Sequence, residues 1–383
     1  MKLGVVGYGV RLQHMVRLFK AEDPDWVLAA VADKRKDMAA QDPVVKSDQS
    51  RLYDDLDQML QAGDLDAVAI GTRCSLHSQL ACKVLKKGLP LFLEKPVSTT
   101  YPDLLKLYQA EQAATSGVVV SFPLRGSALA RLAKEIIDSG KLGTVEHVQA
   151  VNNVPYGAIY FQGWYRDEHE TQGLFLQKAT HDFDYINYLL GTTPTAICAM
   201  NSKQIFKGDK PVGLQCPQCP ENRTCLESSL LKQKMDNFLA GDGCCFAVDT
   251  GNEDSGSAIV RYQSGMHVNY SQNFFARRAA QARGATLLGY KGTLQFDFYT
   301  GELRVIMHHT GRTETYALDQ GEGHHGGDQA LATSFSQLVK DGKPSEFPLK
   351  AGILSALMCL KARQSAMTDT FQTIELSEAG IRE

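Results

Sequence analysis

The chain has no run of apolar residues close to the roughly 20 that a membrane-spanning helix requires. It also lacks an excess of basic charge, since 40 Lys and Arg stand against 43 Asp and Glu. Proteins that bind nucleic acid through a general basic field show the opposite balance. With 43% hydrophobic and 22% charged residues, the composition predicts an ordinary soluble globular protein. We expect neither a membrane nor a nucleic acid among its partners.

A recognisable signal peptide is also missing. Residues 1–6 form an apolar run too short for a signal-peptide core, and no small-residue cleavage site follows. These features predict a cytoplasmic protein, whose thiols usually stay reduced. The nine cysteines are therefore not expected to form a disulfide framework. Because 383 residues exceed one ordinary hydrophobic core, two domains are expected.

The first third of the chain alternates apolar strands with helical stretches around residues 76–87 and 103–114. Continuous apolar strands separated by helices are typical of a parallel sheet covered on both faces. Right-handed crossovers then give a doubly wound Rossmann domain, which we place at residues 1–122. The expected strands are Leu3–Val6, Val27–Ala32, Ala67–Ile70, Leu91–Leu93 and Val118–Val120.

The pattern changes after residue 122. Short β-type runs joined by Gly, Asn and Asp turns predict a large, open, mainly antiparallel sheet. One clear helix, His181–Leu190, interrupts these runs and ends at Gly191. We therefore expect an α+β domain over residues 123–383 for substrate binding and oligomerisation, with a cysteine-rich insert at about 211–245. A C-terminal helix that packs back onto the Rossmann domain is one arrangement we consider.

A glycine turn follows the first strand and opens a helix. Gly7 and Gly9 would let the backbone approach a dinucleotide pyrophosphate, which then lies at the helix N-terminus beside Val10 and Arg11. A third Gly or Ala usually permits close helix–strand packing, but this position is Leu12. The alternative is that the glycines only make a tight turn.

Asp33 ends the second strand, 24 residues beyond Gly9. An acid about 20 residues beyond the second glycine is expected to hydrogen-bond the ribose of a dinucleotide. An acid there favours NAD, because it repels the 2′-phosphate of NADP. Lys34 and Arg35 follow directly and attract that phosphate, so NADP stays open. Alternatively, Asp33 only caps the next segment.

Glu94-Lys95-Pro96 follows the fourth strand, at the carboxyl edge where open α/β sheets bind ligands. With other motifs in the same order, it makes the chain resemble the Gfo/Idh/MocA oxidoreductases, also called the glucose–fructose oxidoreductase and inositol dehydrogenase family. The other motifs are the glycine turn, Gly140-Lys141-Leu142-Gly143, His181-Asp182-Phe183-Asp184 and the segment Gly323–Asp328. Together they extend over nearly the whole chain.

The resemblance implies roles for particular residues. Lys95 would contact the nicotinamide ribose and orient the substrate hydroxyl, with Glu94 beside it at the cofactor. His181 would be the general acid/base, a role that suits an imidazole with an ordinary pKa of about 6.5. His324, His325 and Asp328 look like the family's substrate-lining segment.

Two positions depart from the family pattern. Many members carry an Asp four residues before the helical histidine, where this chain has Gln177. A glutamine cannot accept a proton, so we hypothesise a different relay, with Lys178 as a substrate-hydroxyl ligand or second acid. The family's Thr-Pro-Asn after the third strand is replaced by Gly71-Thr72-Arg73, with His77 beyond it. Arg73 would then meet an anionic group of the substrate or cofactor.

Arg166 is a weaker candidate for the sugar-facing wall. Trp164, Tyr165 and Tyr156 are similar candidates, and each of these side chains is equally compatible with a structural role.

Cysteines are concentrated in the insert. The spacing C-x2-C-x5-C suits structural zinc, which four thiolates hold tetrahedrally. The predicted ligands are Cys216, Cys219, Cys225 and Cys244, with Cys245 as the alternative fourth ligand. An iron–sulfur cluster, a disulfide and free thiols are the other interpretations.

The sequence as a whole predicts an NAD(P)-dependent dehydrogenase or reductase that moves hydride between a secondary alcohol of a sugar, polyol or related compound and the nicotinamide. One alternative is an NAD-dependent glycosidase that oxidises its substrate transiently. Another is a non-catalytic protein that senses dinucleotides on the same fold. The resemblance also implies a homodimer or homotetramer.

Overall fold

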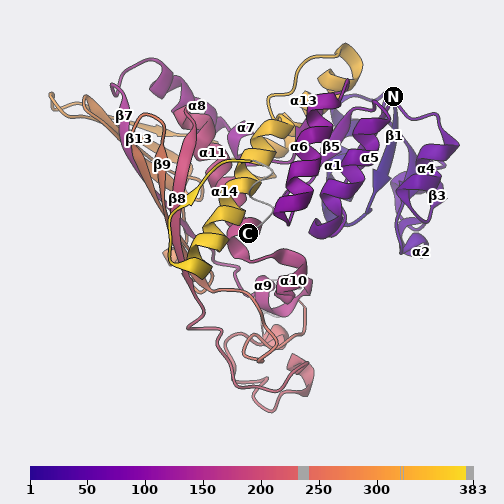
Figure 1. Ribbon diagram of the computed structural model, residues 1–383. Helices are drawn as coiled ribbons and strands as arrows, with labels where there is room; N and C mark the ends of the chain where they lie inside the picture. Colours follow the sequence, from indigo (N-terminus) through magenta and orange to yellow (C-terminus); the bar gives the residue numbers. More distant parts are fainter. Residues whose placement is uncertain (232–240, 320, 322, 377–383) are drawn as a thin grey trace.

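The computed structural model describes residues 1–231, 241–319, 321 and 323–376 (Figure 1). Its first domain contains a six-stranded sheet in the order β3-β2-β1-β4-β5-β6, and every pair is parallel. This arrangement confirms the doubly wound sheet predicted from the apolar runs. The strands are β1 Lys2–Val6, β2 Val27–Ala32, β3 Arg51–Tyr53, β4 Ala67–Ile70, β5 Leu91–Leu93 and β6 Val118–Val120.

Helices cover the faces of this sheet, so every residue of β4, β5 and β6 is buried. Helix α1 Val10–Glu22 follows the glycine turn, and α5 His77–Lys86 lies beside α6 Tyr101–Ala113. The side chain of Thr100 caps α6 by accepting a hydrogen bond from the Asp103 N–H. Shorter helices complete the layer: α2 Lys36–Ala39, α3 Pro43–Ser47 and α4 Leu56–Ala62.

The second domain is built on a nine-stranded sheet in the order β14-β13-β12-β11-β7-β10-β9-β8-β15. Its pairs are antiparallel except for β7 with β10, so the prediction of a mainly antiparallel open sheet is confirmed. Buried and exposed residues alternate along β9 and β10, which leaves one face of the sheet exposed. The strands are β7 Val145–Asn153, β8 Pro194–Ser202, β9 Ser255–Tyr262, β10 His267–Asn273, β11 Ala282–Gly289, β12 Gly292–Asp297, β13 Glu302–Met307, β14 Thr313–Ala317 and β15 Gln372–Thr373.

Helices α7 Pro123–Gly126, α8 Ala128–Asp138 and α11 Thr180–Leu190 lie between this sheet and the first domain (Figure 1). A π-helical turn, η3 Phe175–Ala179, leads directly into α11. Gly191, in the left-handed conformation, ends α11 as the sequence predicts. These elements bring the residues around position 178 to the boundary between the two domains.

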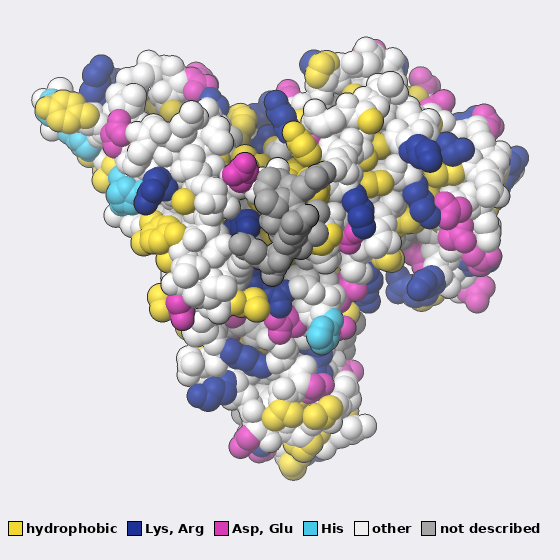
Figure 2. Space-filling model, viewed as in Figure 1, with side chains coloured by type: hydrophobic (Ala, Val, Ile, Leu, Met, Phe, Trp, Pro, Cys, Tyr) yellow, Lys and Arg dark blue, Asp and Glu magenta, His cyan; other side chains and the backbone are white. Residues whose placement is uncertain are grey.

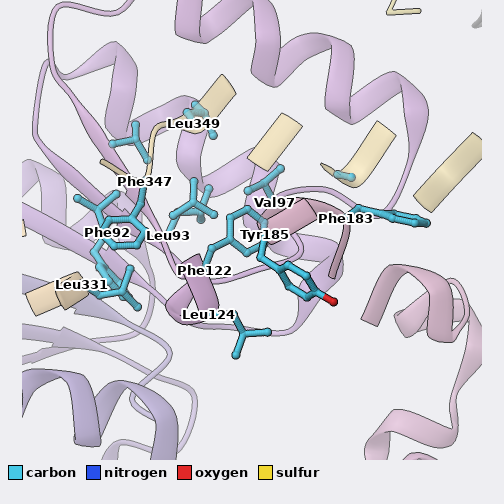
Figure 3. Close-up of a cluster of buried hydrophobic side chains, with 14 of the residues drawn as sticks. Phe92, Leu93, Val97, Phe122, Leu124, Phe183, Tyr185, Leu331, Phe347 and Leu349 are labelled. Atoms are coloured by element: carbon cyan, nitrogen blue, oxygen red, sulfur yellow. The ribbon is translucent and has the colours of Figure 1, made fainter. Parts of the chain in front are cut away.

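The C-terminal chain returns to the first domain. Helix α13 Gly327–Asp341 packs on α1, and α14 Leu349–Thr368 packs on α6, α11 and β8. In this region Phe335 stacks on Trp26 of the Rossmann domain. Figure 3 shows side chains of both parts of the chain in one apolar cluster, including Phe92, Phe122, Tyr185 and Leu331. The two domains therefore share a continuous core.

The insert between β8 and β9 forms the lobe at the lower end of Figure 1. Its described residues are mostly irregular, with a short 3-10 turn at Cys216–Gln218. A separate apolar cluster that includes Phe161, Phe206 and Phe274 holds the base of this lobe. Figure 2 shows hydrophobic side chains at its tip, while acidic and basic side chains are mixed over the rest of the visible face.

None of the helices within the described ranges is both long and apolar enough to cross a membrane.

Candidate active site

The glycine turn has the geometry of a nucleotide-binding turn. Gly7 has a φ of +80°, and a Cβ there would come within 2.8 Å of the Gly71 carbonyl oxygen. Gly9 caps α1, and a Cβ on it would meet no atom within 4 Å, so space is open beside the helix N-terminus. The residues present therefore fit a pyrophosphate.

Leu12 does not prevent close packing between helix and strand. A Cβ on Gly71, at the end of β4, would lie only 2.6 Å from Cγ of Leu12. The space that a third glycine usually provides is thus supplied by Gly71, the residue that follows the neighbouring strand β4. Sequence reasoning missed this compensation because the two residues are far apart in the chain.

Asp33 lies directly beside the turn. Its carboxylate accepts hydrogen bonds from the main-chain N–H of Tyr8 and of Arg35, both at 2.7 Å. The side chains of Lys34 and Arg35 are exposed, and the Arg35 Nε lies 3.8 Å from the Asp33 carboxylate. Val10 is also exposed. Asp33, Lys34 and Arg35 thus flank the place beside the glycine turn where an adenosine ribose would lie.

Arg11 binds protein carboxylates. Its Nε donates to Glu94 at 2.8 Å, and both of its Nη atoms donate to Asp328, each at 2.8 Å. Asp328 also faces Nδ1 of His324 at 3.0 Å. Burial alone would raise the pKa of Asp328, but His324 and Arg11 together hold it well below its usual value. Arg11, Glu94 and Asp328 thus form a network that ties the glycine turn to α13.

His77 holds the loop after β4 in place. It is buried, with Nδ1 2.8 Å from the Pro96 carbonyl oxygen and Nε2 3.2 Å from the Thr72 carbonyl oxygen. The Arg73 guanidinium lies over the Trp164 ring, 4.0 Å from its centroid. His77 therefore connects two segments predicted to contact the cofactor, while Arg73 reaches across to the second domain.

Lys95 crosses the domain boundary as well. Its Nζ donates to the main-chain carbonyl oxygen of Gln177 at 3.1 Å. Burial, together with the charge of Lys178, lowers the pKa of the Lys95 ammonium. The Gln177 side chain is turned toward other groups, since it donates to the Thr171 carbonyl at 2.9 Å and lies 3.6 Å from the thiol of Cys74.

Lys178 is a buried lysine, and its Nζ donates to the hydroxyl of Tyr156 at 2.6 Å. The same ammonium lies 4.7 Å from the centroid of the Tyr156 ring and 5.8 Å from that of Tyr160. Tyr156 was only a weak candidate from sequence, because nothing in its local pattern distinguishes it from a structural tyrosine.

His181, at the start of α11, is 9% exposed and packs edge-on against Phe122 with ring centroids 5.8 Å apart. Its Nδ1 is buried without a hydrogen-bond partner among the described residues. Burial, followed by the charges of Lys95 and Arg283, lowers the pKa of His181 well below 6.5. The imidazole is therefore neutral near pH 7 and able to accept a proton.

Asp182 fixes the start of α11 on the second sheet. Its carboxylate accepts hydrogen bonds from Asn152 at 2.7 Å, Tyr270 at 2.8 Å and Arg283 at 2.8 Å. Arg283 reaches this position from β11 and acts electrostatically on His181 and Lys178. No feature of the sequence singled out Arg283, because its partner lies about a hundred residues away.

The remaining predicted substrate residues lie in two places. His324 and His325, both at positive φ, lie on the loop before α13, where the charge of His324 contributes to lowering the pKa of His181. Arg166 instead pairs with Asp249 of the insert at 2.8 Å. The structure thus brings the two histidines toward the site and engages Arg166 with the insert.

The structure does not support the predicted metal centre. Among the described residues, no three or more His, Cys, Asp or Glu side chains form a group that could hold a metal ion. No disulfide joins the five cysteines predicted as ligands. Burial, followed by the neighbouring Cys216, Cys219 and Cys225, raises the pKa of the Cys244 thiol. Main-chain hydrogen bonds, such as Cys244 N–H to the Leu214 carbonyl at 2.8 Å, order this segment instead.

Two family models match the chain. An oxidoreductase-family model with an NAD-binding Rossmann fold matches residues 1–122. A model of the GFO/IDH/MocA C-terminal domain matches residues 130–295. The matched ranges include the glycine turn, Lys95 and His181.

Curated relatives share parts of this sequence. YteT of Bacillus subtilis (strain 168) is 28% identical over 325 residues, which cover 75% of this chain and 76% of that protein. A myo-inositol 2-dehydrogenase of Thermotoga maritima is 25% identical over 197 residues, or 50% of this chain and 55% of that enzyme. The match thus spans about half the length of the inositol dehydrogenase.

Solved structures share the fold over nearly the whole chain. A levoglucosan dehydrogenase in complex with NADH and levoglucosan has a TM-score of 0.78 at 17% sequence identity, covering 98% of this chain and 99% of that one. At this identity the likeness shows a common fold.

Proposed function

The chain belongs to the Gfo/Idh/MocA oxidoreductase family, and from this premise we propose that it is an NAD-dependent dehydrogenase. It interconverts a secondary alcohol of a sugar, polyol or related compound and the corresponding ketone. The bound nicotinamide supplies the hydride acceptor or donor. Relatives named as inositol dehydrogenases and neighbours named as levoglucosan dehydrogenases support a carbohydrate-like substrate.

The observation that carries this proposal is the meeting of Lys95 and His181 at the domain boundary. Lys95 comes from the end of β5 and His181 from the start of α11, and the Lys95 Nζ donates to the carbonyl oxygen of Gln177, four residues before His181, at 3.1 Å. A hydrogen-bond donor and a neutral base are thus close to each other. Oxidation of an alcohol needs both, because one group orients the hydroxyl and the other takes its proton.

We assign the proton to His181. Its neutral imidazole accepts the hydroxyl proton as the carbon–hydrogen bond breaks, and it returns that proton in the reverse direction. Lys95 donates a hydrogen bond to the same oxygen, held in position by its contact with the Gln177 carbonyl. Lys178, three residues before His181, forms a second hydrogen-bonded pair with Tyr156.

Asp33 supports a preference for NAD over NADP. The main-chain hydrogen bonds from Tyr8 and Arg35 fix its carboxylate beside the glycine turn. A carboxylate held there hydrogen-bonds an adenosine ribose and repels a 2′-phosphate.

We further propose that copies of the chain pair through the exposed face of the nine-stranded sheet. Alternate residues of β9 and β10 face outward there, including Ile259, which is 48% exposed. Light scattering of the purified protein tests this, and a monomer at micromolar concentration would contradict it.

Substrate-dependent reduction of NAD and of NADP tests the proposed function. The panel contains sugars, polyols and sugar acids, and Lys95→Ala is the control variant. We expect the wild type to reduce NAD with at least one compound, and we expect Lys95→Ala to reduce NAD with that compound far more slowly. Binding of both dinucleotides without turnover of any compound would instead indicate a protein that senses nucleotides.

A further inference from the structure

Lys178 is a buried ammonium without a carboxylate partner. Its side chain belongs to a residue that is 5% exposed, and its Nζ donates to the uncharged hydroxyl of Tyr156. Within the described ranges, no acidic side chain forms an ion pair with Lys178 or with Lys95. Lysines are almost never buried in this way unless they are paired.

Arg283 also has unused hydrogen-bonding capacity. The residue is 6% exposed, and its Nε binds Asp182 at 2.8 Å. Its Nη2, however, is buried and has no hydrogen-bond partner among the described residues. Native proteins rarely leave a buried polar atom unpaired, so such an atom calls for an explanation.

The acidic side chains that act electrostatically on Lys178, Arg283 and Lys95 already have partners. Asp182 accepts hydrogen bonds from Arg283, Asn152 and Tyr270. Glu94 is bound by the arginine of the glycine turn. Burial lowers the pKa of the Lys178 ammonium while Tyr156 raises it, and no carboxylate among the described residues contacts its Nζ.

Lys178 binds the hydroxyl of Tyr156, and Arg283 binds Asp182, which follows Lys178 by four residues. Burial on its own raises the pKa of Tyr156, but Lys178 and then Arg283 lower it below its usual value. The residue as a whole is 38% exposed. Arg283 therefore reaches the same stretch of chain, residues 178–182, beside which Tyr156 is partly exposed.

From these contacts we infer that the substrate is an acid: it carries one carboxylate, which Lys178 and Arg283 bind, while its secondary hydroxyl reaches Lys95 and His181. This inference rests on the proposed function and adds a substrate class to it, namely aldonates, uronates and related hydroxy acids. The carboxylate accepts from the Lys178 ammonium and from Nη2 of Arg283. It thereby supplies the counter-ion and the hydrogen-bond acceptor that this part of the structure lacks.

The charge balance favours a carboxylate over a phosphate. Asp182 pairs with Arg283, and Lys95 is placed at the reacting hydroxyl, so Lys178 is the one cation left to bind the anionic group of the ligand. A carboxylate carries one negative charge, whereas a phosphate monoester carries close to two at pH 7. The structure therefore assigns this place to a monoanion.

Matched pairs of substrates test the inference. We would measure kcat and KM with NAD for D-galacturonate against D-galactose, D-gluconate against D-glucitol, and each acid against its amide. Galactose 1-phosphate forms the phosphate arm. Because hydrogen bonds to charged groups are strong, we expect kcat/KM to favour an acid over its neutral partner by roughly 10- to 100-fold.

A charge variant and a matched control locate the effect. Lys178→Met should lower the ratio of kcat/KM for the acid to kcat/KM for its neutral partner by roughly tenfold or more. Lys361→Met is the control, because Lys361 is another buried lysine that lies over a tyrosine ring, 5.3 Å from the centroid of Tyr101. It should leave the preference for the acid intact. Arg283→Lys is a second variant that retains the charge beside Asp182.

The outcomes separate the inference from the proposed function. Equal or better turnover of the neutral partners would overturn the carboxylate site but not the dehydrogenase function. A preference for galactose 1-phosphate would have the same consequence. If no compound is turned over, the proposed function fails, and thermal unfolding with NAD present decides the site. A rise in Tm with galacturonate but not galactose, lost in Lys178→Met, supports the inference, and no difference overturns it.

Discussion

The Nζ of Lys95 donates a hydrogen bond to the main-chain carbonyl of Gln177 over 3.1 Å. This contact joins the Glu94-Lys95-Pro96 segment of the Rossmann domain to the turn that leads into His181. Because the acceptor is a main-chain atom, the Gln177 side chain is free for other contacts. The absence of an Asp at position 177 therefore leaves the placement of Lys95 unaffected.

Replacement of Lys95 should abolish most of the activity. Lys95→Met removes the donor to the reacting oxygen, and such groups contribute roughly 10²- to 10⁴-fold to rates. We expect kcat to fall by that order while NADH binding, followed by fluorescence, stays within a few-fold. Lys95→Arg keeps the charge with a different shape and serves as the comparison. Activity near the wild-type level in Lys95→Met would remove this residue from the mechanism.

The pH profile should report the lowered pKa of His181. Oxidation needs the neutral imidazole, so kcat/KM falls as pH drops through the pKa of His181. Since burial, Lys95, Arg283 and Lys178 lower that pKa, the acid limb should lie below 6.5. Lys178→Met removes one of the lowering charges, so its limb should shift to higher pH. An unchanged limb in this variant would show that another group titrates.

Loss of Arg11 should destabilise the fold. Arg11→Met leaves Glu94 and Asp328 as buried carboxylates without their cation. Breaking a buried ion pair from one side costs about 3–5 kcal/mol. Urea unfolding should therefore give a markedly lower free energy of unfolding. The double variant Arg11→Met/Asp328→Asn, which also removes one stranded charge, should recover part of the loss, and a fully additive loss would contradict the pairing.

Asp328 should contribute to acid sensitivity. Its pKa in the folded protein is depressed, so its stabilising effect is present above the unfolded value of about 3.9 and is lost as pH falls below it. The free energy of unfolding of the wild type should drop more steeply between about pH 5 and pH 3 than that of Asp328→Asn. Parallel curves for the two proteins would exclude this role.

Asp33 should control the choice of dinucleotide. Asp33→Ser removes the charge that repels a 2′-phosphate and leaves the exposed Lys34 and Arg35 to attract it. We expect the ratio of kcat/KM for NAD to that for NADP to fall by roughly fivefold or more, since one close charge is worth at least about 1 kcal/mol. Asp54→Ser, an exposed acid paired with Lys36, is the control and should not change the ratio.

The sequence predicts the architecture well because local patterns determine it. Apolar strands between helices indicate the parallel sheet, and short runs between turns indicate the antiparallel one. The parallel pairing of β7 with β10 was not predicted, because strand order depends on contacts between distant segments. For the same reason Gly71 could not be identified as the residue that accommodates Leu12.

Individual side-chain roles were harder to infer. The sequence assigns Arg11 to the cofactor and Asp328 to the substrate, and these roles stay predictions; it does not reveal that the two side chains bind each other across 317 positions of sequence. The cysteine spacing suggested zinc, yet spacing does not reveal whether the thiols converge, and here they form no group that could hold a metal. No local sequence pattern marks Arg283, although its charge lowers the pKa of both Lys178 and His181.

The origin of the hydride tests the central claim most directly. The experiment uses the best substrate of the panel, deuterated at its carbinol carbons, with NAD and purified enzyme, and mass spectrometry of the nicotinamide product. We predict one deuterium from carbon in each NADH formed, and none when unlabelled substrate reacts in deuterated water. Deuterium taken from the solvent, or conversion of the substrate without net NADH, would contradict a dehydrogenase and favour transient oxidation.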